Sequence, residues 1–295
     1  MNKVIVICGP TATGKSAFAV DIAKRYNGEI ISADSRQVYR GLDIGSAKIT
    51  PAEMQSIPHH LIDVANPRDT FTVTQFKKLA DEKITHIISR GKVPIMCGGT
   101  GMYISAVIDN QEFPEVPPDE QLRSELEQRT APELFDVLLK LDPIRADTID
   151  KNNPVRLIRA IEIAQTLGSV PTQATTESPY DVLMIGLRLP KDELDSKIVQ
   201  RINQRIPGLF TEIRNLHTQS VSSDQLRRFG LEYRYGDAYV TGKILLDEFI
   251  ETLTTKTIQF AKRQMTWFKR DARIHWLNPI SDHQKILKLI QDFLK

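Results

Sequence analysis

The stretch that decides the fold is VIVICGPTATGKS, residues 4–16. Its first five residues form an unbroken apolar run that is mostly β-branched, which is typical of a strand buried on both faces of a parallel sheet. Residues 9–16 then fit the pattern G-x-x-x-x-G-K-[ST], and residues 15–26 repeat apolar side chains at helical spacing. A strand, a glycine-rich loop and a helix in this order predict a phosphate-binding loop, or P-loop.

Each residue type in this loop has a physical role toward phosphate. Gly9 and Gly14 let backbone N–H groups approach phosphate oxygens, and the N-terminus of the helix adds positive potential. Lys15 supplies a mobile charge, and the Ser16 hydroxyl is a Mg²⁺ ligand in such loops. A glycine-rich turn without a ligand is the alternative, but the flanking strand and helix favour the phosphate site. The predicted cradle for a polyphosphate comprises Gly9, Pro10, Thr11, Ala12, Thr13, Gly14, Lys15 and Ser16.

The rest of the chain alternates further strands with helices. Short apolar runs predict strands at residues 29–32, 93–97, 182–189 and 274–277. Helical spacing predicts helices at residues 195–206, 244–270 and 282–294. This alternation predicts an α/β fold, with a P-loop NTPase-like core in which a parallel sheet is flanked by helices.

Residues 113–178 differ in character from the rest. They begin with a proline-rich connector and continue with short helical patterns, of which the last, residues 155–167, is followed by Gly168 as a stop. Residues 172–179 are polar and predict a loop. We therefore expect a small all-helical insert at 113–178, which leaves residues 1–112 and 179–295 as the core.

Composition places the chain among ordinary globular proteins. It has 295 residues, 41% of them hydrophobic, and a formal net charge of only +2. No stretch approaches the roughly 20 apolar residues of a membrane span, and the apolar start is too short for a signal peptide. Cys8 and Cys97 adjoin apolar runs, which favours buried, reduced thiols over a disulfide. We expect a cytoplasmic protein without a membrane partner.

Positive charge gathers in residues 256–273. This segment holds six basic side chains and a single acidic one, Asp271. Such a cluster can bind nucleic-acid phosphates, although a solvated helix face gives the same pattern. Trp267 and Phe268 in the same segment can stack on RNA bases, but an aromatic side chain on a helix is more often part of the core.

Three further features lie outside the P-loop. Asp34 follows the second strand, where a carboxylate can act as a general base or a partner of Mg²⁺, or can cap a helix. Residues 98–101, GGTG, follow the third strand and permit the close approach of a substrate, or form a simple turn. His59 and His60 have no metal-ligand spacing with other histidines or cysteines, which favours a structural role.

Taken together, the chain resembles the tRNA dimethylallyltransferases (tRNA isopentenyltransferases) over nearly its whole length. A P-loop alone is shared by many families, but the ordered set of motifs is specific. The matching stretches are residues 9–16, 32–45, 58–63, 98–103, 156–162, 186–189 and 261–270. Two places depart from the family pattern: Ile258 stands where an arginine is usual, and residues 229–235 replace a Gly-Tyr-[Lys/Arg]-Glu element.

The resemblance implies a reaction. Dimethylallyl diphosphate would be the donor, and N6 of the adenine 3′-adjacent to the tRNA anticodon the acceptor, with diphosphate released. Mg²⁺ would bind at Ser16, the insert would grip the anticodon stem, and the protein would act as a monomer. The catalytic residues implied are Asp34 as the base, with Thr11, Lys15 and Arg205 at the diphosphate. The tRNA-binding residues implied are Asp34, Ser35, Arg36, Gln37, Thr100, Arg156, Arg159, Lys262 and Arg263.

Three other functions suit parts of the same pattern. A P-loop followed by an aspartate also serves small-molecule kinases that use ATP. A prenyl transferase acting on free adenine nucleotides is the second, and a nucleotide-gated RNA-binding protein is the third. The combination of Asp34 with the basic, aromatic segment 261–270 favours the enzyme that acts on tRNA.

Overall fold

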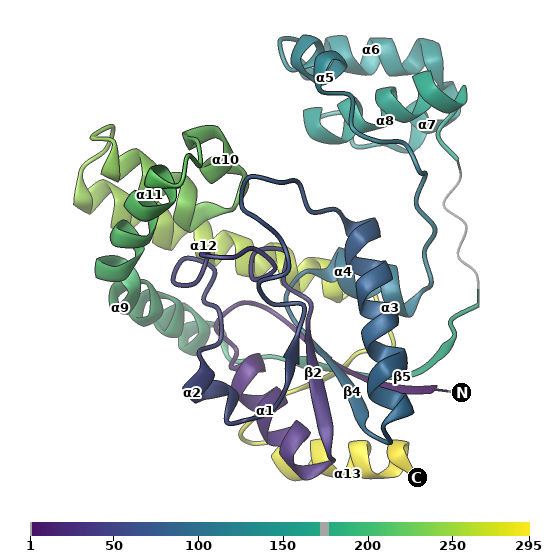
Figure 1. Ribbon diagram of the computed structural model, residues 1–295, viewed down its shortest axis with the longest axis vertical. Helices are drawn as coiled ribbons and strands as arrows, with labels where there is room; N and C mark the ends of the chain where they lie inside the picture. The colour runs from purple at the N-terminus through teal and green to yellow at the C-terminus, as the bar shows by residue number, and fades with distance from the viewer. Residues whose placement is uncertain (1, 172–176) are drawn as a thin grey trace. The chain divides into compact units, whose positions relative to one another are not determined.

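The computed structural model describes residues 2–171 and 177–295, and its centre is a parallel sheet (Figure 1). Its strands lie in the order β3-β2-β4-β1-β5-β6, and every neighbouring pair is parallel. The predicted parallel α/β core is therefore confirmed, and only the short edge strand β3 was not expected. The strands are β1 (Asn2–Cys8), β2 (Gly28–Ser32), β3 (His59–His60), β4 (Val93–Cys97), β5 (Tyr180–Leu187) and β6 (His275–Leu277).

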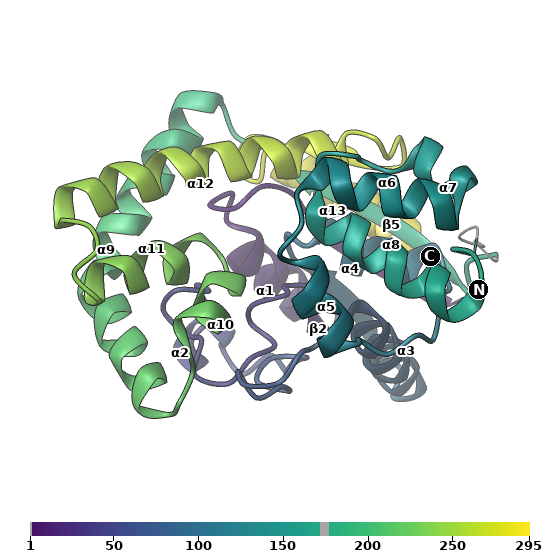
Figure 2. The ribbon, with the colours of Figure 1, turned by 90° about the horizontal axis from the view of Figure 1, so that it is seen from above.

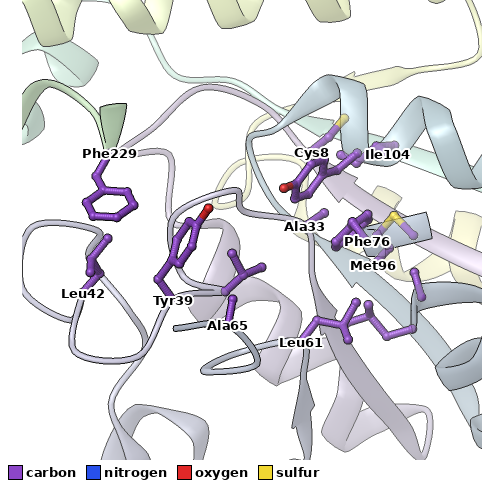
Figure 3. Packing of buried hydrophobic residues seen from close by; sticks show 14 of the residues in the cluster. Cys8, Ala33, Tyr39, Leu42, Leu61, Ala65, Phe76, Met96, Ile104 and Phe229 are labelled. Carbon is purple, nitrogen blue, oxygen red and sulfur yellow. The ribbon is translucent and has the colours of Figure 1, made fainter. Parts of the chain in front are cut away.

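Alternation along β1 explains why helices cover both faces of the sheet. Ile5 and Ile7 point to the face covered by α1 (Lys15–Arg25) and α13 (His283–Leu294). Val4 and Val6 point to the opposite face, which is covered by α3 (Val73–Ser89) and α4 (Gly101–Ile108). Since side chains of a strand alternate between its faces, an unbroken apolar run is what a doubly covered strand requires. Figure 3 shows part of the apolar packing on this second face, around Cys8, Phe76 and Ile104.

A group of helices stands beside the carboxyl ends of the strands. Figure 2 shows α9 (Lys191–Thr218), α11 (Leu231–Val240) and α12 (Leu246–Phe268) side by side, and contacts join each pair of them. Two short helices complete the unit: α2 (Pro51–Met54) and α10 (Ser223–Arg228). The sequence predicted that the α9 helix ends at residue 206, before a proline, but it continues through Pro207 because its second half buries Leu209, Phe210 and Ile213.

Residues Gln111–Thr176 form a second compact unit, and Met1–Asn110 with Glu177–Lys295 form the first. The second unit holds α5 (Glu120–Leu126), α6 (Ala131–Leu141), α7 (Pro143–Thr148) and α8 (Pro154–Leu167) around its own apolar core. Helix α8 ends as predicted, with Gly168 in the left-handed conformation at φ 83°. Residues 172–176 of the predicted loop lie outside the described residues.

Two expectations drawn from composition can be compared with the structure. Cys8 and Cys97 are both free and buried, as predicted, and burial raises the pKa of each thiol to about 12. In the part of the chain that is described, no helix is both long enough and apolar enough to cross a membrane.

A buried carboxylate, Glu29, stabilises the start of β2. It accepts two hydrogen bonds from Arg90, at 2.9 and 2.7 Å, one from Lys92 at 2.8 Å, and lies 2.7 Å from Nε2 of His60. Burial by itself would raise the pKa of Glu29, but these partners hold it at about 2. His59 and His60 thus form the edge strand β3, in line with the predicted structural role. Among the described residues, no group of three or more metal-ligating side chains occurs.

Replacement of Glu29 by glutamine should therefore destabilise the protein. It leaves Arg90 and Lys92 without their anion, and the loss should be about 3 kcal/mol in urea unfolding at pH 7. Because the folded pKa lies below the ordinary value near 4.3, the stabilisation is present above about pH 4.3 and is lost as the pH falls toward 2. Glu251→Gln, at an exposed position, is the control. Equal unfolding midpoints for the two variants would contradict this account.

Candidate functional site

Three loops meet at the carboxyl edge of the sheet. The P-loop follows β1, Asp34 follows β2, and residues 98–101 follow β4, and these three strands are neighbours in the sheet. Parallel strands end at the same edge, so the loops line one cavity of about 810 Å³. This volume is typical of a ligand site. Helices α9 and α12 supply further walls of the same cavity.

The P-loop has the backbone shape that its glycines allow. Gly9 and Gly14 have φ of 133° and 83°, and a Cβ at Gly9 would lie 2.5 Å from the carbonyl oxygen of Leu187. Within the loop, the Thr13 hydroxyl donates to the Pro10 carbonyl at 2.9 Å, and Lys15 Nζ donates to the same oxygen at 2.6 Å. Helix α1 then begins at Lys15, as predicted.

Lys15 and two arginines of α9 place positive charge beside the P-loop. Arg201 and Arg205, one helical turn apart, both line the cavity, and Arg201 Nη1 donates to the Thr11 hydroxyl at 3.2 Å. Burial lowers the pKa of Lys15 to about 8, while burial and then the charge of Arg201 lower that of Arg205 to about 10. Three partly desolvated cations at one place strongly favour an anionic ligand.

Arg201 was not among the residues that the sequence singled out, whereas Arg205 was. The signal was available, because two arginines four residues apart on a predicted helix share a face. The sequence alone could not show that this face of the helix lies within hydrogen-bond distance of Thr11.

Asp34 caps a turn instead of a helix. Its Oδ1 accepts from the backbone N–H groups of Arg36 at 2.8 Å and Gln37 at 3.4 Å, and residues 35–38 form turns. Oδ2 has no hydrogen-bond partner within residues 2–171 and 177–295, and Asp34 lines the cavity. The aspartate is thereby oriented through one oxygen and presents the other to a ligand. The helix-cap interpretation is therefore wrong, and the general-base interpretation is compatible with this geometry.

The other residues predicted near Asp34, which are Ser35, Arg36, Gln37 and Thr100, all line the cavity. The Thr100 hydroxyl accepts from the Ser35 backbone N–H at 3.0 Å, which joins the loops after β2 and β4. The side-chain amide of Gln37 is occupied on both sides, since its oxygen accepts from Ser32 at 3.1 Å and its nitrogen donates to the Ala47 carbonyl at 3.2 Å. Gln37 therefore holds its own loop in place, and it also lines the cavity together with Ser35 and Arg36.

The glycines after β4 make room for α12. A Cβ at Gly99 would lie 2.5 Å from the side-chain nitrogen of Gln264, and one at Gly101 would lie 2.1 Å from the indole nitrogen of Trp267. The sequence analysis predicted that residues 98–101 either allow a substrate to approach closely or form a simple turn. In the structure, the side chains of Gln264 and Trp267 approach these glycines instead.

Gln264 is the connection that sequence reasoning missed. Its side-chain oxygen accepts from the Thr11 backbone N–H at 2.9 Å, and its side-chain nitrogen donates to the Gly99 carbonyl at 3.0 Å. The side chain is buried and spans two loops that are far apart in the sequence. A glutamine can make both bonds because its amide carries an acceptor and a donor. One residue of α12 thereby fixes the P-loop against the loop after β4.

Helix α12 presents aromatic and basic side chains to the cavity. Phe260, Arg263 and Trp267 line it, and the Arg263 guanidinium lies 5.8 Å from the Phe260 ring centroid. Phe268 also borders the cavity, but it is only 3% exposed and packs in the core. Lys262 is exposed on the helix but does not line the cavity. The segment is therefore partly cavity wall, partly core and partly solvated face.

Arg156 and Arg159 lie in the second compact unit, on α8. Arg156 is exposed. Arg159 donates to the Val116 carbonyl at 2.9 Å and to Glu162 at 3.3 Å, and the buried Glu162 also pairs with Arg123 at 2.7 Å. Arg159 thus also stabilises its own unit.

Comparison with known proteins identifies the family. Residues 37–271 match the family model described as IPP transferase. The chain belongs to the IPP transferase family. The tRNA dimethylallyltransferase of Anoxybacillus flavithermus is 41% identical over 95% of this chain and 92% of its own length. That of Halalkalibacterium halodurans is 40% identical over 99% and 96%.

Solved structures of this family have the same fold. The tRNA isopentenylpyrophosphate transferase of Bacillus halodurans is 40% identical and superposes with a TM-score of 0.74, covering 100% of this chain and 96% of its own. A eukaryotic dimethylallyltransferase, in a structure described as acting on tRNA, is 26% identical with a TM-score of 0.85, covering 100% and 80%. The resemblance inferred from the motifs is confirmed, and the protein is an enzyme of the prenyl transferase class.

Both departures from the family pattern have a structural setting. Tyr233, within residues 229–235, donates to Glu212 at 2.8 Å and accepts from the Ser46 N–H at 3.2 Å. Glu212 also accepts from the backbone N–H groups of residues 43–45. This cluster fixes a loop that borders the cavity. Ile258 is partly buried and packs against the core.

Gln264→Met tests the connection between the two loops. Methionine keeps the length of the side chain but leaves the Thr11 N–H and the Gly99 carbonyl without partners. We expect a loss of about 1–3 kcal/mol in unfolding free energy, measured by urea denaturation. Gln259→Met, at an exposed site on the same helix, should change stability by less than about 0.5 kcal/mol. A Gln264 variant as stable as that control would contradict the assignment.

Proposed function

We propose that this enzyme transfers the dimethylallyl group of dimethylallyl diphosphate to N6 of the adenine that lies 3′ to the anticodon in tRNA. The observation that carries the proposal is the cavity itself, in which Lys15, Arg201 and Arg205 gather around the P-loop while Asp34 faces the same space. The reaction needs cations that stabilise the anionic leaving group and a carboxylate that accepts the proton of the amine.

The cations stabilise the leaving diphosphate. Negative charge develops on the bridging oxygen as the bond to the allylic carbon breaks, and groups that are already oriented and desolvated offset it most effectively. Lys15, Arg201 and the P-loop N–H groups stand where they can bind it. Mg²⁺, when bound, adds Lewis-acid stabilisation of the same oxygens.

The residues present fit Mg²⁺ bound chiefly through a substrate. Ser16 lines the cavity at the first turn of α1, and Glu53 supplies a carboxylate to the same space. Magnesium in phosphate-transfer sites commonly takes one or two protein ligands together with phosphate oxygens and water. A dedicated cage of protein carboxylates is not needed for that mode.

Asp34 accepts the proton of the adenine amine. An exocyclic amine becomes an effective nucleophile as its proton leaves, and a positioned carboxylate contributes roughly 10²–10⁴-fold to such steps. Oδ1 is held by the N–H groups of Arg36 and Gln37, so Oδ2 is the oxygen that takes the proton. The amine lone pair forms the new C–N bond while diphosphate departs with the C–O electrons.

The acceptor base must leave its stack to reach this cavity. Phe260 and Trp267 provide aromatic faces on which a flipped base can stack, and Arg36 and Arg263 can pair with backbone phosphates. We assign the second compact unit, with Arg156 exposed on α8, to the anticodon stem. The protein would work as a cytoplasmic monomer, a setting in which free thiols such as Cys8 persist.

A label-transfer experiment tests the proposed function. The protein is incubated with Mg²⁺ and dimethylallyl diphosphate labelled in the prenyl group, and is offered unmodified tRNA, AMP or ATP. Label should enter tRNA alone, and nuclease digestion with mass spectrometry should place it on N6 of the adenine beside the anticodon. Label in AMP would support a nucleotide prenyl transferase instead, and phosphate transfer from ATP would support a kinase.

Asp34→Asn separates the base from the binding groups. The amide is of similar shape but cannot accept the proton, so turnover should fall by about 10²-fold or more. The dissociation constant for dimethylallyl diphosphate should change by less than about threefold, because the cations that bind it are intact. Single-turnover transfer to tRNA and calorimetric titration measure the two quantities. A variant that turns over at the wild-type rate would remove Asp34 as the base.

The pH dependence of donor binding tests Lys15. Because burial lowers its pKa to about 8, Lys15 is charged below that pH and loses its charge as the pH rises through it. The dissociation constant for dimethylallyl diphosphate should therefore increase by about tenfold from pH 7 to pH 9. Lys15→Arg, which keeps its charge, should flatten this dependence. A profile identical in both proteins would contradict a role for the lysine charge.

A further inference from the structure

An unpartnered hydroxyl lies in the middle of α12. Among buried side-chain nitrogen and oxygen atoms of the described residues, only His59 Nε2 and Thr257 Oγ1 lack a hydrogen-bond partner. His59 is on the edge strand β3 and does not line the cavity, whereas Thr257 does. Thr257 is 6% exposed, so water does not readily satisfy it. A buried hydroxyl without a partner is costly, and it is uncommon enough to require an explanation.

The surroundings of Thr257 indicate what its partner would be. Besides the large cavity, Thr257 lines a small, mainly apolar pocket that adjoins it, and the two cavities share a boundary. Side chains that line both of them include Thr11, Arg201 and Arg205, which belong to the P-loop and to α9. Arg201 already donates to the Thr11 hydroxyl at 3.2 Å. The boundary also carries the carboxyl group of Glu232, whose pKa is raised by burial. The two guanidinium groups and the Thr11 hydroxyl supply several donors there, and an anion with several acceptor oxygens complements these donors.

The Thr257 hydroxyl does not make the hydrogen bond within the helix that is common for threonine. A threonine inside a helix commonly donates to the carbonyl one turn earlier, which satisfies it locally. Thr266, on the same helix, does this, with its hydroxyl 3.0 Å from the Lys262 carbonyl. Thr257 makes no such bond, so its hydrogen is available to a ligand.

We propose that the Thr257 hydroxyl is a binding group that donates a hydrogen bond to a diphosphate oxygen of the prenyl donor. This inference rests on the proposed function, since it takes the cavity to hold that donor. The prenyl group itself has no acceptor and cannot satisfy the hydroxyl. Thr257 thus adds a donor from α12 to the anion site that the P-loop and α9 form.

Thr257→Val and Thr257→Ser test the proposal. Valine has nearly the same shape without the hydroxyl, and serine keeps the hydroxyl. We expect the valine variant to bind both dimethylallyl diphosphate and inorganic diphosphate, with Mg²⁺, about tenfold more weakly in calorimetric titrations. The serine variant should stay within about threefold of wild type. The melting temperature of the unliganded valine variant should be equal or higher, because an unsatisfied buried hydroxyl has been removed.

Three results would overturn the assignment. The first is wild-type affinity of the valine variant for both ligands. The second is a loss of stability in the unliganded valine variant that parallels the loss of affinity, which would indicate a packing role. The third is weaker binding of dimethylallyl diphosphate with unchanged binding of diphosphate. That result would indicate that residue 257 contacts the prenyl group and not the diphosphate. Failure of the proposed function is distinct, because wild-type protein would then transfer no prenyl group to tRNA.

Discussion

The parallel pairing of β1 with β4, and of β4 with β2, is the constraint on which the site depends. Ile5 and Ile7 pair with Ile95 and Cys97, and the next strand continues the same register. Since all three strands run in one direction, their carboxyl ends share an edge. Apolar burial on both faces holds these strands inside the sheet, so the P-loop, Asp34 and the loop after β4 meet at its carboxyl edge.

The helices that follow β5 convert this edge into a cavity with defined walls. Two buried polar side chains do most of the positioning: Gln264 joins the P-loop to the loop after β4, and Glu212 holds the backbone of residues 43–45. Each of them satisfies backbone groups that would otherwise be unpaired away from water. Since α9 and α12 also carry Arg201, Arg205 and the aromatic side chains, the elements that shape the cavity also supply its binding groups.

Local pattern in the sequence was enough to predict the sheet core, the P-loop and the cap of α8, because each depends on neighbouring residues. It was not enough for contacts made across the fold. The predicted helix ended at residue 206, just before Pro207, but burial of Phe210 and Ile213 stabilises the helix beyond that proline. Gln264 stood inside a recognised motif, but its role depends on Thr11, which lies 253 residues away. The glycines at 99 and 101 reserve space for side chains from the same distant helix.

We propose that one cavity holds the leaving group and the nucleophile together. A crystal structure with Mg²⁺, an unreactive thiolo analogue of dimethylallyl diphosphate and an anticodon stem-loop measures this directly. We expect diphosphate on residues 9–16, with the adenine N6 within about 3 Å of an Asp34 oxygen and about 3–3.5 Å from the allylic carbon. An adenine still stacked in its loop, or a diphosphate bound away from Lys15 and Arg201, would contradict it.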